Sequence, residues 1–101
     1  MTATPAQVAN DLVLQAQYFA KRDGQVASAC RDCARLIRAF IAGEKVDGRT
    51  YSGVHQRMFN MDRRYTGETQ IAKSVMRGLS TLQRLHHEVA GMQGRLVRDH
   101  E

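Results

Sequence analysis

The chain has 101 residues, of which 43% are hydrophobic and 25% are charged, and its formal net charge is +5. This length and composition predict one folded domain, residues 1–101, and exclude an intrinsically disordered chain. No apolar run reaches the roughly 20 residues that span a bilayer, and the first 20 residues lack the basic start and apolar block of a signal peptide. We therefore expect a cytoplasmic protein with no membrane partner.

A strong helix-start signal opens the chain. Thr4 can serve as an N-cap, Pro5 suits the first helical position, and Gln7 can return a hydrogen bond to the cap. Apolar residues then recur at helical spacing until the polar segment 21–24 interrupts them. The pattern predicts a first helix, a short turn and an antiparallel neighbour.

Two further helices are expected at about 25–42 and 51–65. The apolar stripe of the first of these recurs every three or four residues, as Val26, Cys30, Cys33, Ile37 and Phe40. Gly43 should end it. The pattern over 51–65 is weaker because Gly53 lowers helix propensity near its start. We expect a short helix there that packs across the others.

The last third of the chain contains the longest apolar pattern. Thr66 can cap a helix that runs from about 67 to 98. Glu68 would place a negative charge at the positive, N-terminal end of that helix dipole. One apolar face, the C-terminal seam, recurs in steps of three and four residues: Ala72, Val75, Leu79, Leu82, His86, Val89, Gln93 and Leu96. Such a helix is about 45 Å long and the first two helices are each about 25 Å long, so about half of the seam lacks cover.

An uncovered seam predicts self-association. Each large apolar side chain left in water forgoes about 1.5–3 kcal/mol of burial, and a two-fold dimer is the simplest remedy. The predicted homodimer interface comprises Val75, Leu79, Leu82, His86, Val89, Gln93 and Leu96. His86 either fixes the register of the pair or lies at the edge of the core with its ring nitrogens hydrated. In the alternative to a dimer, Gly91 and Gly94 end the helix early, because together they destabilise it by about 2 kcal/mol relative to alanine.

The chain offers little catalytic or metal-binding chemistry. Cys30 and Cys33 resemble a redox or zinc half-site, but both fall on an apolar stripe and are predicted to be core thiols. Even with His86 they would supply three of the four ligands that zinc requires. The ten carboxylates are scattered, and no nucleophile-base pair or phosphate-binding glycine loop stands out. We expect no metal, no cofactor and no enzymatic activity.

Arginine dominates the positive charge, with twelve arginines and three lysines. Seven arginines form two groups, one on the second helix and one in segment 49–65: Arg31, Arg35 and Arg38, then Arg49, Arg57, Arg63 and Arg64. Such groups suit an acidic partner, although solvated helical proteins also carry them.

The sequence as a whole predicts an all-α protein of three shorter helices and a long C-terminal helix, which dimerises through the long helix and acts by binding. The favoured function is that of a regulator or adaptor whose arginines engage an acidic protein. The alternative is a nucleic-acid-binding protein. In segment 49–65 the aromatic rings of Tyr51 and Tyr65 interleave with arginines that can contact phosphates, and such rings can stack on bases.

Overall fold

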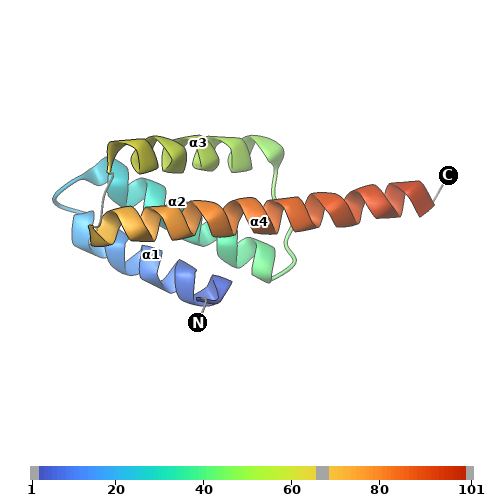
Figure 1. Ribbon diagram of the computed structural model, residues 1–101, viewed down its shortest axis with the longest axis horizontal. Helices are drawn as coiled ribbons and strands as arrows, with labels where there is room; N and C mark the ends of the chain where they lie inside the picture. Colours follow the sequence, from blue (N-terminus) through green and yellow to red (C-terminus); the bar gives the residue numbers. More distant parts are fainter. Residues whose placement is uncertain (1–2, 66–68, 100–101) are drawn as a thin grey trace.

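The computed structural model describes the backbone of residues 3–65 and 69–99 and the side chains of residues 3–65 and 69–90. These ranges form a compact bundle of four helices, α1 (Pro5–Phe19), α2 (Gly24–Ile41), α3 (Gly48–Arg64) and α4 (Gln70–Asp99) (Figure 1). The all-α prediction, with the longest helix at the C-terminal end, is confirmed. No helix in the described part of the chain has both the length and the apolar character needed to cross a membrane.

The helices alternate in direction along the chain, and α2 and α4 form the central pair (Figure 1). α1 packs against both central helices, and α3 packs against the same two. Within the described residues the backbones of α1 and α3 do not come close to each other. α4 continues beyond the ends of the other helices, and the molecule is accordingly elongated, with a longest dimension of 52 Å.

Local signals set the ends of α1 and α2. The Gln7 amide donates to Thr4 Oγ1 at 3.2 Å and the Thr4 amide donates to Gln7 Oε1 at 2.9 Å, which confirms the predicted capping box. Asp23 caps α2 by accepting hydrogen bonds from two backbone amides. Gly43 follows α2 with a φ of +74°, a left-handed conformation that favours glycine, and it ends the helix as predicted.

α3 differs from its prediction. It begins at Gly48 and has 17 residues, and Figure 1 shows it lying alongside α4. The expectation of a short helix packed across the others is therefore wrong. Glycine in a helix interior costs about 1 kcal/mol, whereas full burial of a single methionine is worth about 1.5–3 kcal/mol. Burial of Met58 and Met61 thus outweighs the effect of Gly53.

α4 begins at Gln70, and Thr69 stands before it with Oγ1 accepting a hydrogen bond from the Ala72 amide at 3.3 Å. The predicted cap at Thr66 and Glu68 lies outside the described residues. The helix continues to Asp99, so Gly91 and Gly94 do not end it early.

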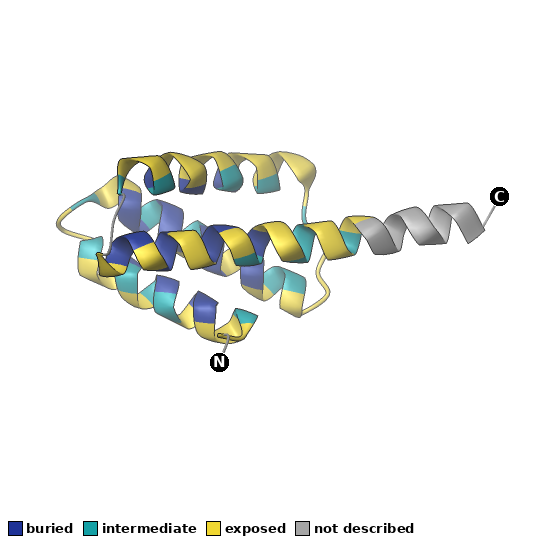
Figure 2. Ribbon diagram, viewed as in Figure 1, coloured by how far each residue is buried: buried dark blue, intermediate teal, exposed yellow. Residues whose placement is uncertain are grey.

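The core lies where α4 runs beside the other three helices (Figure 2). Its largest fully buried apolar side chains come from all four helices: Leu12, Val26, Ile37, Met58, Val75 and Leu82. A buried glycine, Gly78, makes room for side chains of the neighbouring helices, because a Cβ there would lie 2.9 Å from Leu12 Cδ1 and 3.1 Å from Met58 Cε. Side chains of α1 and α3 therefore meet α4 at one point that has no room for a further methyl group.

Candidate functional site

The arginine stripe of α2 faces solvent. Arg31, Arg35 and Arg38 are all exposed, and their spacing places them along one side of the helix. Two exposed arginines of α3, Arg49 and Arg57, lie beside this stripe and share a groove with Arg35. We call these five residues the α2 arginine surface. The fold thus brings together five of the seven arginines that the sequence marked as binding residues.

A groove between α1 and α2 borders this surface on one side. Its volume is about 460 Å³, and it is lined by Val13, Arg31, Ala34, Arg35, Arg38, Ala39, Ala42 and Glu44. The short side chains of three alanines and the half-buried Val13 give it an apolar floor. Arg38 also reaches α1, where its guanidinium donates to Asn10 Oδ1 at 2.8 Å. The groove therefore combines an apolar floor with arginines along one wall.

A second groove lies between α2 and α3, with a volume of about 240 Å³. Its floor includes the buried side chains of Leu36 and Val54, and its arginines are Arg35, Arg49 and Arg57. Arg35 lines both grooves, so the two are adjacent along α2. Five guanidinium groups face only two carboxylates along both linings, which leaves the surface with a net charge of +3.

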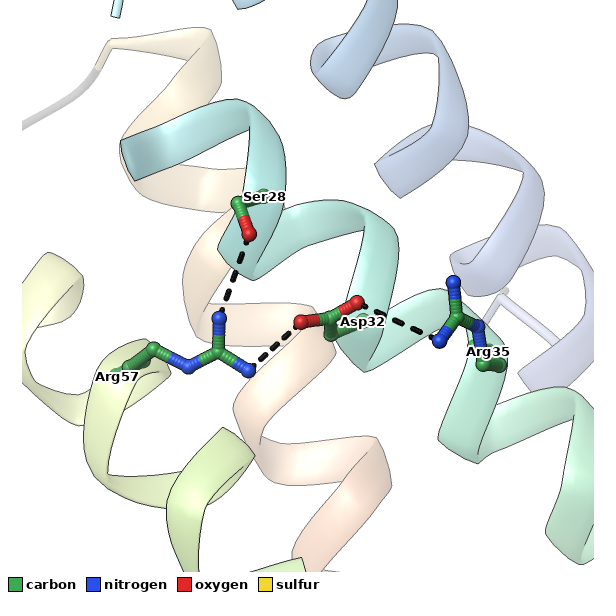
Figure 3. A network of polar contacts seen from close by, with 4 residues as sticks. All are labelled: Ser28, Asp32, Arg35 and Arg57. Carbon is green, nitrogen blue, oxygen red and sulfur yellow. Dashed lines mark hydrogen bonds and ion pairs between the residues drawn. The ribbon is translucent and has the colours of Figure 1, made fainter. Parts of the chain in front are cut away.

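Asp32 lies between Arg35 and Arg57 and pairs with both (Figure 3). Arg57 crosses from α3 and donates to Asp32 Oδ2 at 2.7 Å and to Ser28 Oγ at 3.4 Å. Arg35 Nη1 lies 3.9 Å from Asp32 Oδ1. Exposed ion pairs of this kind contribute at most about 1 kcal/mol to stability. The main consequence is geometric, because Asp32 holds Arg57 against α2 and leaves Arg35 loosely attached.

Arg63 and Arg64 lie outside this surface, at the opposite end of α3 from Arg49. Arg64 Nη2 lies 3.5 Å from Asp23 Oδ2, and the Tyr65 hydroxyl donates to the same oxygen at 3.0 Å. Burial acts to raise the pKa of Asp23, but hydrogen bonds from the Val26 amide and the Tyr65 hydroxyl outweigh it and lower the pKa. This cluster ties the end of α3 to the start of α2. Arg63 is exposed.

The aromatic residues of segment 49–65 are engaged within the chain. The Tyr51 ring stacks on the His86 ring with 3.7 Å between centroids and 8° between planes, and Tyr65 is bonded to Asp23. His55 Nε2 lies 2.8 Å from Gln83 Nε2 in a hydrogen bond. A base that stacks on Tyr51 from the side of α4 would have to displace His86. The predicted stacking platform for nucleic acid is therefore partly occupied.

The structure divides the predicted dimer interface into three parts. Val75, Leu79 and Leu82 are 0%, 8% and 0% exposed, because α1, α2 and α3 cover them. His86 and Val89 are half-buried. The side chains of Gln93 and Leu96 lie outside the described residues. A partner chain cannot reach the first three residues without opening the bundle, so the revised interface omits them.

The two cysteines are free and fully buried, which confirms their prediction as core thiols. Burial raises the pKa of Cys30 to about 11 and that of Cys33 to about 12. Such thiols stay protonated at neutral pH and are poor nucleophiles and metal ligands. Among the described residues, no three His, Cys, Asp or Glu side chains are grouped so that they could hold a metal ion.

One groove was not predicted from the sequence. It lies between α1 and α4, has a volume of about 790 Å³, and is lined by Ala3, Gln7, Val8, Met76, Arg77, Ser80, Thr81 and Arg84. The spacing of Arg77 and Arg84, seven residues apart on the polar face of a helix, was the available signal. Asp23 was missed as well, although an aspartate directly before an apolar helical pattern is a cap signal.

No protein-family model matches the chain, and no curated protein or solved structure matches it. The arrangement of its own residues is therefore the basis for a functional assignment. Of the features described, the α2 arginine surface gathers the most arginines and adjoins two grooves with apolar floors.

Proposed function

We propose that this protein is a non-enzymatic helical binding protein, a homodimeric regulator or adaptor that engages an acidic partner protein through the α2 arginine surface. The observation that carries the proposal is the gathering of five arginines beside two grooves with apolar floors. Charge complementarity of this kind steers association and selects partners. The free, buried cysteines fit a reducing cytoplasm as the place of action.

Two observations favour a protein over a nucleic acid as the partner. Alanine and valine side chains in the α1/α2 groove can pack against apolar side chains, which a phosphate backbone lacks. Tyr51 and Tyr65, the rings best placed in the sequence for base stacking, are engaged by His86 and Asp23. Nucleic-acid binding stays the alternative, through the exposed arginines of segment 49–65.

The proposed dimer uses the part of α4 that runs beyond the bundle (Figure 1). The C-terminal seam continues into this part with Val89, Gln93 and Leu96. Pairing with a second copy about a two-fold axis would give the apolar residues of the seam a partner along this part. His86 would lie at the margin of the interface because it already packs on Tyr51.

Size-exclusion chromatography with light scattering tests the dimer. At tens of micromolar we expect a mass about twice the chain mass of 11.4 kDa. Val89→Glu should produce a monomer with unchanged helix content, and Ser80→Glu, on an exposed position of α4, should leave the dimer intact. A monomeric wild-type protein contradicts the dimer.

A mobility-shift assay with duplex DNA and with single-stranded RNA separates the two classes of partner. We expect no shift at low salt with micromolar protein. A shift that weakens steeply with salt, and that disappears when Arg57, Arg63 and Arg64 are all changed to glutamate, would instead establish the nucleic-acid alternative. Circular dichroism of the triple variant checks that the fold is retained.

A further inference from the structure

We propose that the α1/α2 groove binds an acidic amphipathic helix, with carboxylates directed at Arg31, Arg35 and Arg38 and small apolar side chains directed at the groove floor. This inference rests on the proposed function and names the class of ligand that one of the two grooves accepts. It assigns the α2/α3 groove no part in holding the partner helix.

The spacing of the arginines matches a helical ligand. Arg31, Arg35 and Arg38 follow one another at intervals of four and three residues, so they span about 10 Å along α2. A second helix laid along α2 presents carboxylates over the same distance when its acidic residues repeat at the same intervals. An extended strand alternates its side chains between two faces every residue and does not reproduce this spacing.

The floor of the groove suits close packing of a helix. Ala34, Ala39 and Ala42 carry short side chains, and Val13 of α1 completes this apolar floor. Small residues let two helices approach to the lower end of the usual interaxial range of about 8–10 Å. Apolar side chains on the inner face of the ligand can then enter the groove while its carboxylates meet the arginines above it.

The charges in the groove also set a direction for the ligand. Glu44 lies at the end of the groove that is nearest to the C-terminal end of α2, beyond Arg38. Arg38 is already bonded to Asn10 at 2.8 Å. Arg35 is held less tightly, with 3.9 Å between its Nη1 atom and Asp32 Oδ1. The strongest attraction for carboxylates is therefore at Arg31 and Arg35. A ligand helix should carry its acidic residues there and a neutral or basic residue opposite Glu44.

The α2/α3 groove is the weaker candidate. Asp32 lies in its lining and already holds Arg57 at 2.7 Å, so an incoming carboxylate meets a like charge. In the α1/α2 groove the lining carboxylate is Glu44 alone, at one end. Electrostatic complementarity thus selects the α1/α2 groove for an acidic ligand.

The test uses the full chain and two synthetic peptides. One is a 16-residue helical peptide with glutamates at intervals of four and three residues on one face and alanine and leucine beside them; the other has the same composition in scrambled order. Fluorescence anisotropy at low salt should show that the patterned peptide binds about tenfold more tightly than the scrambled one. Amide chemical-shift changes should centre on Val13, Ala34 and Ala39.

Matched variants locate the binding site. Arg31→Glu combined with Arg35→Glu should weaken binding of the patterned peptide about tenfold or more, whereas Arg63→Glu combined with Arg77→Glu, on exposed arginines outside the α2 arginine surface, should change it less than about twofold. Arg49→Glu, measured in parallel, tests the α2/α3 groove. If the double variant loses helix content, Arg31→Gln combined with Arg35→Gln should still weaken binding. Circular dichroism checks the fold of each variant.

Three results would overturn the inference. Equal binding of the patterned and scrambled peptides would show that charge alone is recognised. A loss of binding in Arg49→Glu, with none in the double variant, would move the site to the α2/α3 groove and leave the proposed function standing. Failure of both peptides to bind, together with a shift of DNA or RNA in the mobility assay, would remove the proposed function as well.

Discussion

The Tyr51 ring of α3 lies face to face with the His86 ring of α4, with 3.7 Å between centroids and 8° between planes. Phe40 of α2 meets the same His86 ring edge-on at 6.3 Å. Three helices thus close the end of the core with aromatic contacts. The stack gives His86 a partner inside its own chain, in a position that the sequence assigned to a dimer interface.

His86→Ala should therefore lower the stability of the bundle rather than break a dimer. Aromatic pairs of this kind contribute about 0.5–1.5 kcal/mol beyond the area that they bury. We expect urea denaturation to show a free energy of unfolding lower by about 1 kcal/mol. His87→Ala, at the adjacent exposed position, should stay within about 0.5 kcal/mol of the wild type. Dissociation of a dimer by His86→Ala with no loss of stability would contradict this role.

Gly78→Val should destabilise the core. Its Cβ would meet Leu12 and Met58, two fully buried side chains with little room to move, at 2.9 and 3.1 Å. Overpacking of this kind costs about 1–3 kcal/mol. The matched change Gly53→Ala adds a methyl group in open space on α3 and should raise stability by up to about 1 kcal/mol. Thermal and urea unfolding of the two variants should show opposite shifts. An unchanged stability of Gly78→Val would contradict tight packing of Leu12 and Met58 against Gly78.

Cys30 and Cys33 should resist labelling in the folded protein. Burial raises the thiol pKa values to about 11 and about 12 from an ordinary value of 9.0, so the reactive thiolate is scarce at pH 8. We expect a thiol reagent to modify both cysteines quickly in urea and only at the rate of opening in native buffer. The raised pKa values also mean that the thiols stabilise the fold below about pH 9 and lose that contribution as the pH rises through the folded values. Rapid labelling of either thiol in the native protein would contradict core burial.

The Asp23–Tyr65 hydrogen bond should make stability fall on the acid side. The pKa of Asp23 is lowered in the fold from its ordinary value of 3.8, so its carboxylate stabilises the protein above about pH 4 and loses that effect as the pH falls through the folded-state value. Asp23→Asn, which keeps a capping oxygen without the charge, should lower the melting temperature at pH 7 and flatten its decline between about pH 5 and pH 3.

Tyr65→Phe provides the companion measurement for this pair. The hydrogen bond to Asp23 raises the pKa of Tyr65 above 10.0, so the phenol stabilises the fold below pH 10 and loses that effect as the pH rises further. Removing the hydroxyl should lower the melting temperature at pH 7 and also reduce the acid-side decline, because Asp23 loses a donor. An acid profile identical to that of the wild type would show that the Tyr65–Asp23 bond does not contribute.

The sequence predicted the parts of the fold that depend on neighbours along the chain. The Thr4 capping box, the glycine at the end of α2 and the apolar stripes each act within a few residues, and all are present in the structure. The length of α3 was not predicted correctly because the low helix propensity of Gly53 is visible in the sequence, whereas the burial of Met58 between α3 and its neighbours α2 and α4 is not.

The candidate site was predictable only in part, for the same reason. The arginine stripe of α2 follows from helical periodicity alone. The pairing of Arg57 with Asp32 joins residues 25 positions apart, and that of Tyr65 with Asp23 joins residues 42 positions apart. Such contacts depend on which helices become neighbours, and periodicity does not specify that. The C-terminal seam likewise predicted that this face of α4 packs against other helices, but not how much of the face α3 covers.

Affinity capture from an extract of the native cells, treated with nuclease, most directly tests whether the α2 arginine surface binds an acidic protein. The wild-type chain should be compared with Arg31→Glu/Arg35→Glu and with a charge-matched control, Arg63→Glu/Arg77→Glu, which alters exposed arginines elsewhere. We expect the wild type and the control to retain a protein with an acidic surface, and the α2 variant and high salt to release it. Equal capture by the α2 variant, or loss of all capture on nuclease treatment, would contradict the proposal.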